Sequence, residues 1–165
     1  MPEKRSVFWF RRDLRLSDNH GLYKALVSGN KVLPIFIFDT EILSQLENKE
    51  DRRVDFIFQA LNDMNDELQK IGRAIQIFHG KPLEIFQKIT QDFAVEKVFC
   101  NEDYEPSAIT RDLAVADFLT SRKIEFQSFK DQVHFHKDEI LKSDKTPYTV
   151  YTPYSKQWIL KYDAE

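Results

Sequence analysis

Cysteine, glycine and long apolar runs are all scarce in this sequence of 165 residues. With one cysteine, Cys100, the chain cannot form an internal disulfide, which favours a reducing compartment, so we expect a cytoplasmic protein. No apolar run approaches the ~20 residues that span a bilayer, and the run from Val7 to Phe10 is too short for a signal peptide. The charges, 24 Lys and Arg against 27 Asp and Glu, give −3, which argues against a strongly basic nucleic-acid module.

The few glycines also exclude the common phosphate-binding loops. The chain has 4 of them, and no two are spaced as in G-x-G-x-x-G or G-x-x-x-x-G-K-[ST]. The first apolar run is followed instead by Arg11-Arg12-Asp13-Leu14-Arg15, so we expect neither NAD nor a nucleoside triphosphate. The histidines and Cys100 show no spacing typical of a metal site, and no set of side chains stands out as catalytic. We therefore predict no metal and no catalytic residue.

The apolar fraction of 42% can supply the core of one compact domain. Five short segments have the composition of strands: residues 6–10, 31–38, 74–78, 97–100 and 124–129. The first two are continuous apolar runs, as in strands buried on both faces, although Pro34 weakens the second. The last alternates polar and apolar residues, which is typical of an edge strand with one wet face.

Helical patterns separate these segments. The sequence Ser17-Asp18-Asn19 offers caps for a helix to about Val27, and residues 54–71 and 83–93 repeat apolar side chains at spacings of three and four. Ser107 is expected to cap a fourth helix. The side chains expected to face inward there are Ile109, Leu113, Ala116 and Leu119. This alternation predicts an α/β fold: a three-layer, doubly wound, Rossmann-like sheet of five mainly parallel strands, with helices on both faces and right-handed crossovers.

The stretch from Gln132 to Glu165 breaks this rhythm. It contains two prolines, four tyrosines and Trp158, and it begins a helix at about Ser155 that has no stop signal. Two interpretations stay open: a frayed C-terminal helix, or the point at which a second domain starts.

Open parallel sheets bind ligands beyond the carboxyl ends of their strands. The second strand ends at Phe36-Ile37-Phe38-Asp39, and residues 101–106 follow the fourth. Carboxylates beside aromatic rings could accept hydrogen bonds from a planar heterocycle. Alternatively, Asp39 and Glu105 cap turns or pair with arginines such as Arg53. For residues 11–15 we favour a salt-bridged loop over a phosphate site.

Several motifs resemble those of the DNA photolyase/cryptochrome family, in the same order and over nearly the whole chain. They are residues 7–19, residues 33–39, Arg53-Val54, residues 101–106, Arg111-Asp112 and residues 147–158. The resemblance implies an N-terminal α/β antenna domain over residues 1–130. Residues 131–165 would begin the linker towards a helical FAD-binding domain that this sequence does not contain.

The resemblance also implies a function: an antenna pigment absorbs near-ultraviolet or blue light and passes the energy to reduced FAD. The flavin then donates an electron to a cyclobutane pyrimidine dimer, which splits. The full-length protein would be a deoxyribodipyrimidine photolyase, a carbon–carbon lyase, whereas these 165 residues alone would not be catalytic. The expected partners are the chain's own FAD domain and, through the full-length protein, damaged DNA; the fragment is expected to be monomeric.

In deazaflavin-type members the pigment lies inside this domain. The matching positions here are Phe36, Ile37, Phe38, Asp39, Arg53, Asp103 and Glu105. Folate-type members carry an Asn-Glu pair just after the Tyr-Glu step, where this sequence has Ser107-Ala108, so a deazaflavin or flavin antenna is favoured over folate. Two alternatives stay open: the same domain of a cryptochrome photoreceptor, and a stand-alone module that binds a small ligand.

Overall fold

The computed structural model describes residues 3–48 and 50–164 and divides the chain into two compact units. The first unit extends to Gln132, and the second extends from Val133 to the end of the chain. The first is an α/β sandwich, and the second contains the helix α6 (Tyr151–Tyr162). Each unit is described separately below.

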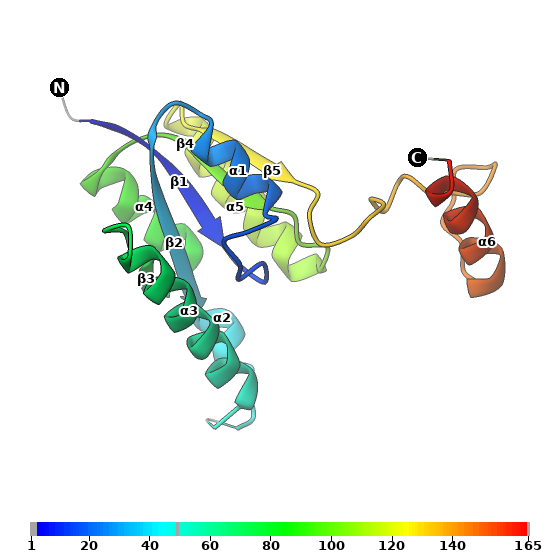
Figure 1. The fold of residues 1–165 in the computed structure, drawn as a ribbon, viewed down its shortest axis with the longest axis horizontal. Helices are drawn as coiled ribbons and strands as arrows, with labels where there is room; N and C mark the ends of the chain where they lie inside the picture. Colours follow the sequence, from blue (N-terminus) through cyan, green and yellow to red (C-terminus); the bar gives the residue numbers. More distant parts are fainter. Residues whose placement is uncertain (1–2, 49, 165) are drawn as a thin grey trace. The chain divides into compact units, whose positions relative to one another are not determined.

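The sheet of the first unit contains five strands, in the order β3-β2-β1-β4-β5 (Figure 1). Their bounds are β1 (Lys4–Phe10), β2 (Lys31–Asp39), β3 (Gln76–Gly80), β4 (Ala94–Asn101) and β5 (Glu125–Phe129). All four pairings are parallel. The predicted five-stranded, Rossmann-like α/β sheet is therefore confirmed.

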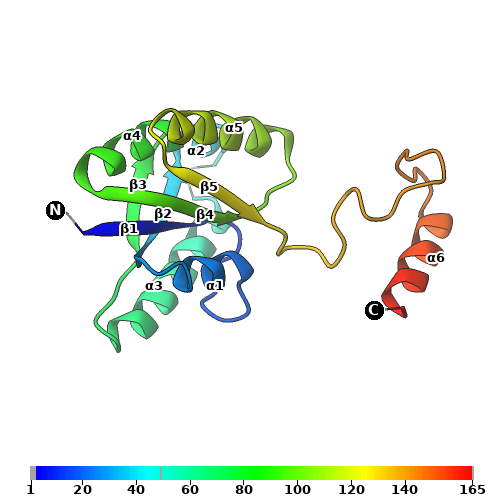
Figure 2. The same ribbon diagram turned by 90° about the horizontal axis from the view of Figure 1, so that it is seen from above.

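Helices cover both faces of this sheet. Their bounds are α1 (His20–Leu26), α2 (Thr40–Leu43), α3 (Arg52–Gln69), α4 (Pro82–Asp92) and α5 (Pro106–Ser121). Figure 2 shows α1 and α3 on one face and α4 and α5 on the other. Strand β1 is central and buried on both sides: Val7 and Trp9 join the core under α4 and α5, whereas Phe8 and Phe10 join the core under α1 and α3. This is why its sequence is a continuous apolar run.

Two local features of the sequence also fit the sheet. Strand β5 lies at one edge, as its alternating pattern predicted. Pro34 is tolerated in β2 because the pairing with β3 begins one residue later, at Ile35. Strand β3 begins at Gln76 rather than at Ala74, since the backbone N–H of Ile75 donates to the Asn65 side chain of α3 at 2.7 Å.

The predicted inward face of α5 is partly wrong. Ile109 and Leu113 are 38% and 60% exposed, and the helix begins at Pro106, so Ser107 lies inside its first turn. The helix is rotated because Arg111 and Asp112 point towards the end of β1, where they contact Trp9 and Arg11. Phe58 and Ile71, which fall on the apolar stripe predicted for residues 54–71, are likewise exposed.

The second unit has a small aromatic core. Its helix α6 begins at Tyr151, earlier than the predicted start at Ser155. The rings of Trp158 and Tyr162 stack with centroids 5.2 Å apart, and buried Phe135 lies edge-on to Trp158. In the described part of the chain, no helix has the length and hydrophobicity needed to cross a membrane.

The burial of β1 leads to a test of stability. Phe8 is fully buried, so Phe8→Ala should lower the free energy of unfolding by ~3–5 kcal/mol, because the side chain leaves a cavity. Phe56 on α3 is 71% exposed and provides a matched control: Phe56→Ala should change stability by about 0.5 kcal/mol or less. Urea titration measures both variants, and equal effects would contradict the position assigned to β1.

Candidate functional site

The carboxyl ends of β1 and β4 form the topological switch point of the sheet. The chain leaves β1 towards β2 on one side, whereas β4 and β5 lie on the other side of β1. In open α/β sheets this reversal opens a crevice in which ligands bind. Here the chain's own side chains occupy that position.

Arg11 fills the crevice on the face covered by α5. Its guanidinium donates hydrogen bonds to the Asp112 carboxylate and to the Asn101 carbonyl oxygen, and it lies 5.0 Å from the centre of the Trp9 ring. The side chain is only 5% exposed. Burial lowers the pKa of Arg11, but the charge and the hydrogen bond of Asp112 oppose this effect, so the pKa is raised and the cation is retained.

Asn101 fills the crevice on the opposite face, under α1. Its amide nitrogen donates to Asp13 at 2.6 Å and to the Asn19 side-chain oxygen at 2.8 Å. Its own side-chain oxygen accepts the backbone N–H of Gly21 at 2.9 Å. A Cβ at Gly21 would lie 2.6 Å from that oxygen, so glycine is required for this close approach of α1 to β4.

The first turn of α1 is satisfied by protein side chains. The N–H groups of His20, Gly21 and Leu22 donate to Asp131, Asn101 and Asn19, respectively. Those N–H groups are the ones that hold phosphate in dinucleotide-binding folds. Their use here gives a structural reason for the predicted lack of NAD and nucleotide binding.

The arginines after β1 form the salt-bridged loop that we favoured over a phosphate site. In addition to the Arg11–Asp112 pair, Arg15 pairs with Asp131 at 2.6 Å and Arg12 pairs with Glu105 at 2.6 Å. The loop is thereby tied to the segments that follow both β4 and β5.

The four predicted site residues at the end of β2 differ in accessibility. Phe36 and Ile37 are each 6% exposed and lie in the cores on opposite faces of the sheet. Phe38 is half-buried, with its ring edge-on to Phe36 at 4.9 Å. Asp39 is buried and caps α2, because it accepts the backbone N–H of Glu41 at 2.9 Å. Of the two interpretations of Asp39, a ligand acceptor or a cap, the structure shows the cap.

Asp103 and Glu105 lie together after β4. Arg12 contacts both: its Nε is 3.5 Å from Asp103 Oδ2, and its Nη2 is 2.6 Å from Glu105 Oε1. Arg53, in contrast, is highly exposed and pairs with Asp51. Its hydrogen bond lowers the pKa of Asp51 to about 2.

Strand β1 separates β2 from β4, so the group at Asp39 and the group at Asp103 are roughly two strand spacings, or about 10 Å, apart. The cation that contacts the second group is Arg12, which is not among the seven predicted site residues. Its partners Asp103 and Glu105 lie some 90 residues further along the chain, so no short-range sequence pattern links them to Arg12.

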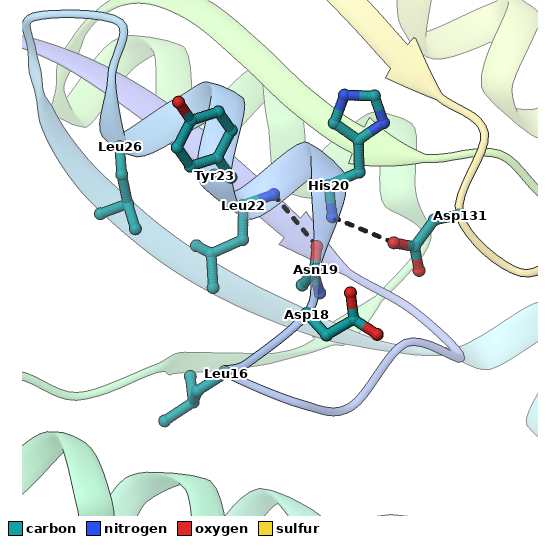
Figure 3. Close-up of a pocket in the computed structure, with 8 residues that line it drawn as sticks. All are labelled: Leu16, Asp18, Asn19, His20, Leu22, Tyr23, Leu26 and Asp131. Atoms are coloured by element: carbon teal, nitrogen blue, oxygen red, sulfur yellow. Dashed lines mark hydrogen bonds between the residues drawn. The ribbon is translucent and has the colours of Figure 1, made fainter.

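A surface pocket of about 530 Å³ lies beside α1 (Figure 3). Leu16, Leu22, Leu26 and Tyr23 form its apolar wall. The polar lining residues Asn19 and Asp131 already accept N–H groups of α1. The residues lining this pocket do not include any of the seven predicted site residues.

Neither a metal site nor an activated thiol is evident in the described segments. Over residues 3–48 and 50–164, no three His, Cys, Asp or Glu side chains gather as metal ligands would. Burial raises the pKa of Cys100 to about 12, so its thiol stays protonated at neutral pH.

Comparison with known proteins identifies the family. The family model for DNA photolyase matches residues 6–165, and the chain therefore belongs to the DNA photolyase family. It is 34% identical over 152 residues to a deoxyribodipyrimidine photo-lyase of a Synechococcus species, covering 92% of this chain and 31% of that protein. It is also 32% identical over 127 residues to Cryptochrome-1 of Drosophila melanogaster, covering 73% of this chain and 23% of that protein.

A solved structure agrees with the fold. The archaeal photolyase of Sulfolobus tokodaii superimposes with a TM-score of 0.71 at 33% identity, covering 80% of this chain and 32% of that one. That crystal structure holds two FAD molecules, which implicate a novel light-harvesting cofactor in that protein. The chain spans about a third of the length of the photolyases it matches.

The central position of Asn101 leads to a second test of stability. Asn101→Ala should lower the free energy of unfolding by about 2–4 kcal/mol, because the Gly21 N–H loses its acceptor and buried Asp13 loses one of its donors. Asn62→Ala, at an exposed position of α3, is the matched control and should have an effect within about 0.5 kcal/mol. Thermal or urea unfolding measures the change in stability of both variants. If Asn101→Ala is as stable as the parent chain, the structural role given to the Asn101 hydrogen bonds is disproved.

Proposed function

We propose that this chain is the light-harvesting domain of a deoxyribodipyrimidine photolyase and holds a flavin or deazaflavin antenna. The observation that carries the proposal is the 34% identity to a deoxyribodipyrimidine photo-lyase over 92% of this chain. The second FAD of the Sulfolobus photolyase supports an antenna of the flavin class.

The side chains at the strand ends suit such a ligand. Asp39, Asp103 and Glu105 supply carboxylate acceptors for the N–H and O–H groups of a flavin-like ring and its polyol chain. Half-buried Phe38 offers an aromatic edge, whereas buried Phe36 and Ile37 would contribute through the backbone that follows them. Arg53, on the exposed first turn of α3, would close the outer side of the site.

When bound, such a pigment supplies absorption of near-ultraviolet or blue light. The residues described here would bind and orient it, and would also exclude water from one of its edges. The FAD, the damaged DNA and the electron transfer that splits a pyrimidine dimer belong to the rest of the full-length protein, which we place in the cytoplasm. The unit from Val133 onward would begin the linker towards that FAD domain.

A cryptochrome photoreceptor is the second candidate function. It is favoured by the 32% identity to Cryptochrome-1 of Drosophila, and it would use the same domain for signalling. The third candidate is a small-ligand binding module with no light chemistry.

The antenna site can be tested at Asp39. Asp39→Ser keeps an acceptor that can cap α2 but removes the carboxylate. We expect the Kd for riboflavin, FMN or a 5-deazaflavin to rise about tenfold, as for the loss of one charge-assisted hydrogen bond. Fluorescence titration measures the affinity, and urea unfolding should show a change of about 1 kcal/mol or less.

Asp144→Ser is the matched control, because Asp144 also accepts a backbone N–H two residues further on but lies in the second unit. It should leave flavin affinity unchanged. If Asp39→Ser binds as tightly as the parent chain, Asp39 does not belong to the antenna site.

The proposed activity is tested on the protein expressed from its complete reading frame. We expect flavin absorption bands and repair of oligonucleotides containing cyclobutane pyrimidine dimers under blue light, but not in the dark. Flavin bands without repair of the pyrimidine dimers would support the cryptochrome photoreceptor. A colourless protein would exclude both light-driven functions and leave the small-ligand binding module.

A further inference from the structure

We propose that Arg12 is the positioning residue that sets the geometry of Asp103 and Glu105 for the antenna. This inference rests on the proposed function, because it assumes that the two carboxylates bind the pigment. It adds a residue from the loop after β1 to a site otherwise built from the segments that follow β2 and β4.

One guanidinium holds both carboxylates. Arg12 Nη2 is 2.6 Å from Glu105 Oε1, while Arg12 Nε is 3.5 Å from Asp103 Oδ2. The second oxygen of Asp103 accepts the backbone N–H of Glu105 at 3.3 Å. The three groups therefore form a closed cluster, which we call the Arg12 clamp.

The side chain of Glu105 is directed to this clamp instead of to its own helix. Glu105 occupies the N-cap position of α5 but makes no side-chain capping bond. The N-cap residues Asn19, Asp39 and Asp51 each bond an N–H of the helix that they precede. The hydrogen bond that Arg12 donates to Glu105 also raises the pKa of Arg12, in keeping with a firmly held cation.

The exposed half of the clamp contributes little to the stability of the fold. Arg12 and Glu105 are 56% and 57% exposed, and ion pairs this exposed are weak in water. Asp103 differs, since its side chain is only 7% exposed and a buried carboxylate needs a nearby cation. The effect of Arg12 on Glu105 is therefore separable from folding, whereas Asp103 depends on Arg12 for that cation.

Fixed acceptors favour a ligand that brings hydrogen-bond donors. The charge of Arg12 offsets the electrostatic repulsion between the two carboxylates. Acceptors held before binding lose less conformational entropy when the ligand arrives. The positive charge of Arg12 is already balanced by its two carboxylate partners. The clamp should therefore bind the N–H and O–H edge of the pigment's ring system and not a phosphate group.

The experiment is a fluorescence titration of the 165-residue chain with two probes, riboflavin and FMN. Arg12→Gln should raise the Kd of both probes about tenfold, as for a lost charge-assisted contact, and Arg12→Lys should recover part of the loss. Arg15→Gln is the matched control: Arg15 lies in the same loop and also forms a 2.6 Å ion pair, but with Asp131. The Kd of the Arg15→Gln variant for both probes should stay within about twofold of the parent value.

Two further measurements separate positioning from other roles. Adding Glu105→Gln to Arg12→Gln should cause little extra loss, because both changes disrupt the same clamp. The unfolding midpoint of Arg12→Lys should match that of the parent, because a cation stays beside Asp103, whereas Arg12→Gln should lower it by removing that cation.

The outcomes are distinct. If the parent chain binds neither probe, the antenna proposal fails and this inference fails with it. Parent-like affinity in Arg12→Gln overturns the role of Arg12 while leaving the antenna proposal intact. A loss for FMN alone would mean that Arg12 contacts the phosphate directly, which also overturns a positioning role.

Discussion

The burial of the Arg11 guanidinium is the constraint on which the carboxyl end of the sheet depends. Moving a cation out of water costs several kcal/mol unless its charge and its hydrogen bonds are compensated. The partners that compensate it come from two other elements: the Asn101 carbonyl at the end of β4 and the Asp112 carboxylate on α5. Asp112 is in turn held by Arg111 at 3.0 Å. The charge can therefore be buried only when β1, β4 and α5 meet at this edge, which makes their arrangement mutually dependent.

These side chains occupy the place where the topology would otherwise put a ligand. Arg11 closes the switch point from the side of α5, and Asn101 closes it from the side of α1. The helix N–H groups that would bind a phosphate are used by Asn19, Asn101 and Asp131. What remains at this edge includes the carboxylates after β4 and the half-buried rings of Phe38 and Tyr104. A sheet order shared with dinucleotide-binding proteins thus leaves no free N–H groups of α1 for a phosphate here, because side chains and not topology alone determine what this edge can bind.

The fold could be predicted where the burial of an element gives its sequence a recognisable pattern of apolar residues. Strand β1 is buried on both faces, and its continuous apolar run identified it. The alternating run identified β5 as an edge strand, although Phe126 and Phe129 pack against the cores on opposite faces of the sheet. The stripe on α5 failed at Leu113, because half-buried Arg111 and Asp112 occupy the inward face and a search for apolar residues cannot detect them. At the site, the motifs located the ends of β2 and β4. They did not indicate that Asp39 caps a helix, or that Arg12 reaches carboxylates some 90 residues further on, since neither contact has a sequence period.

The two sets of charges at this edge therefore have different consequences. Breaking a buried pair such as Arg11–Asp112 leaves an uncompensated charge in the interior, at about 3–5 kcal/mol, which is a large part of the stability of an ordinary domain. Exposed pairs such as Arg12–Glu105 contribute roughly 0.2–1 kcal/mol. The interior network consequently determines whether the strands and helices assemble, whereas the rim can change its charges at little cost to folding. Ligand specificity can then vary at the rim while the buried network, and with it the fold, stays the same.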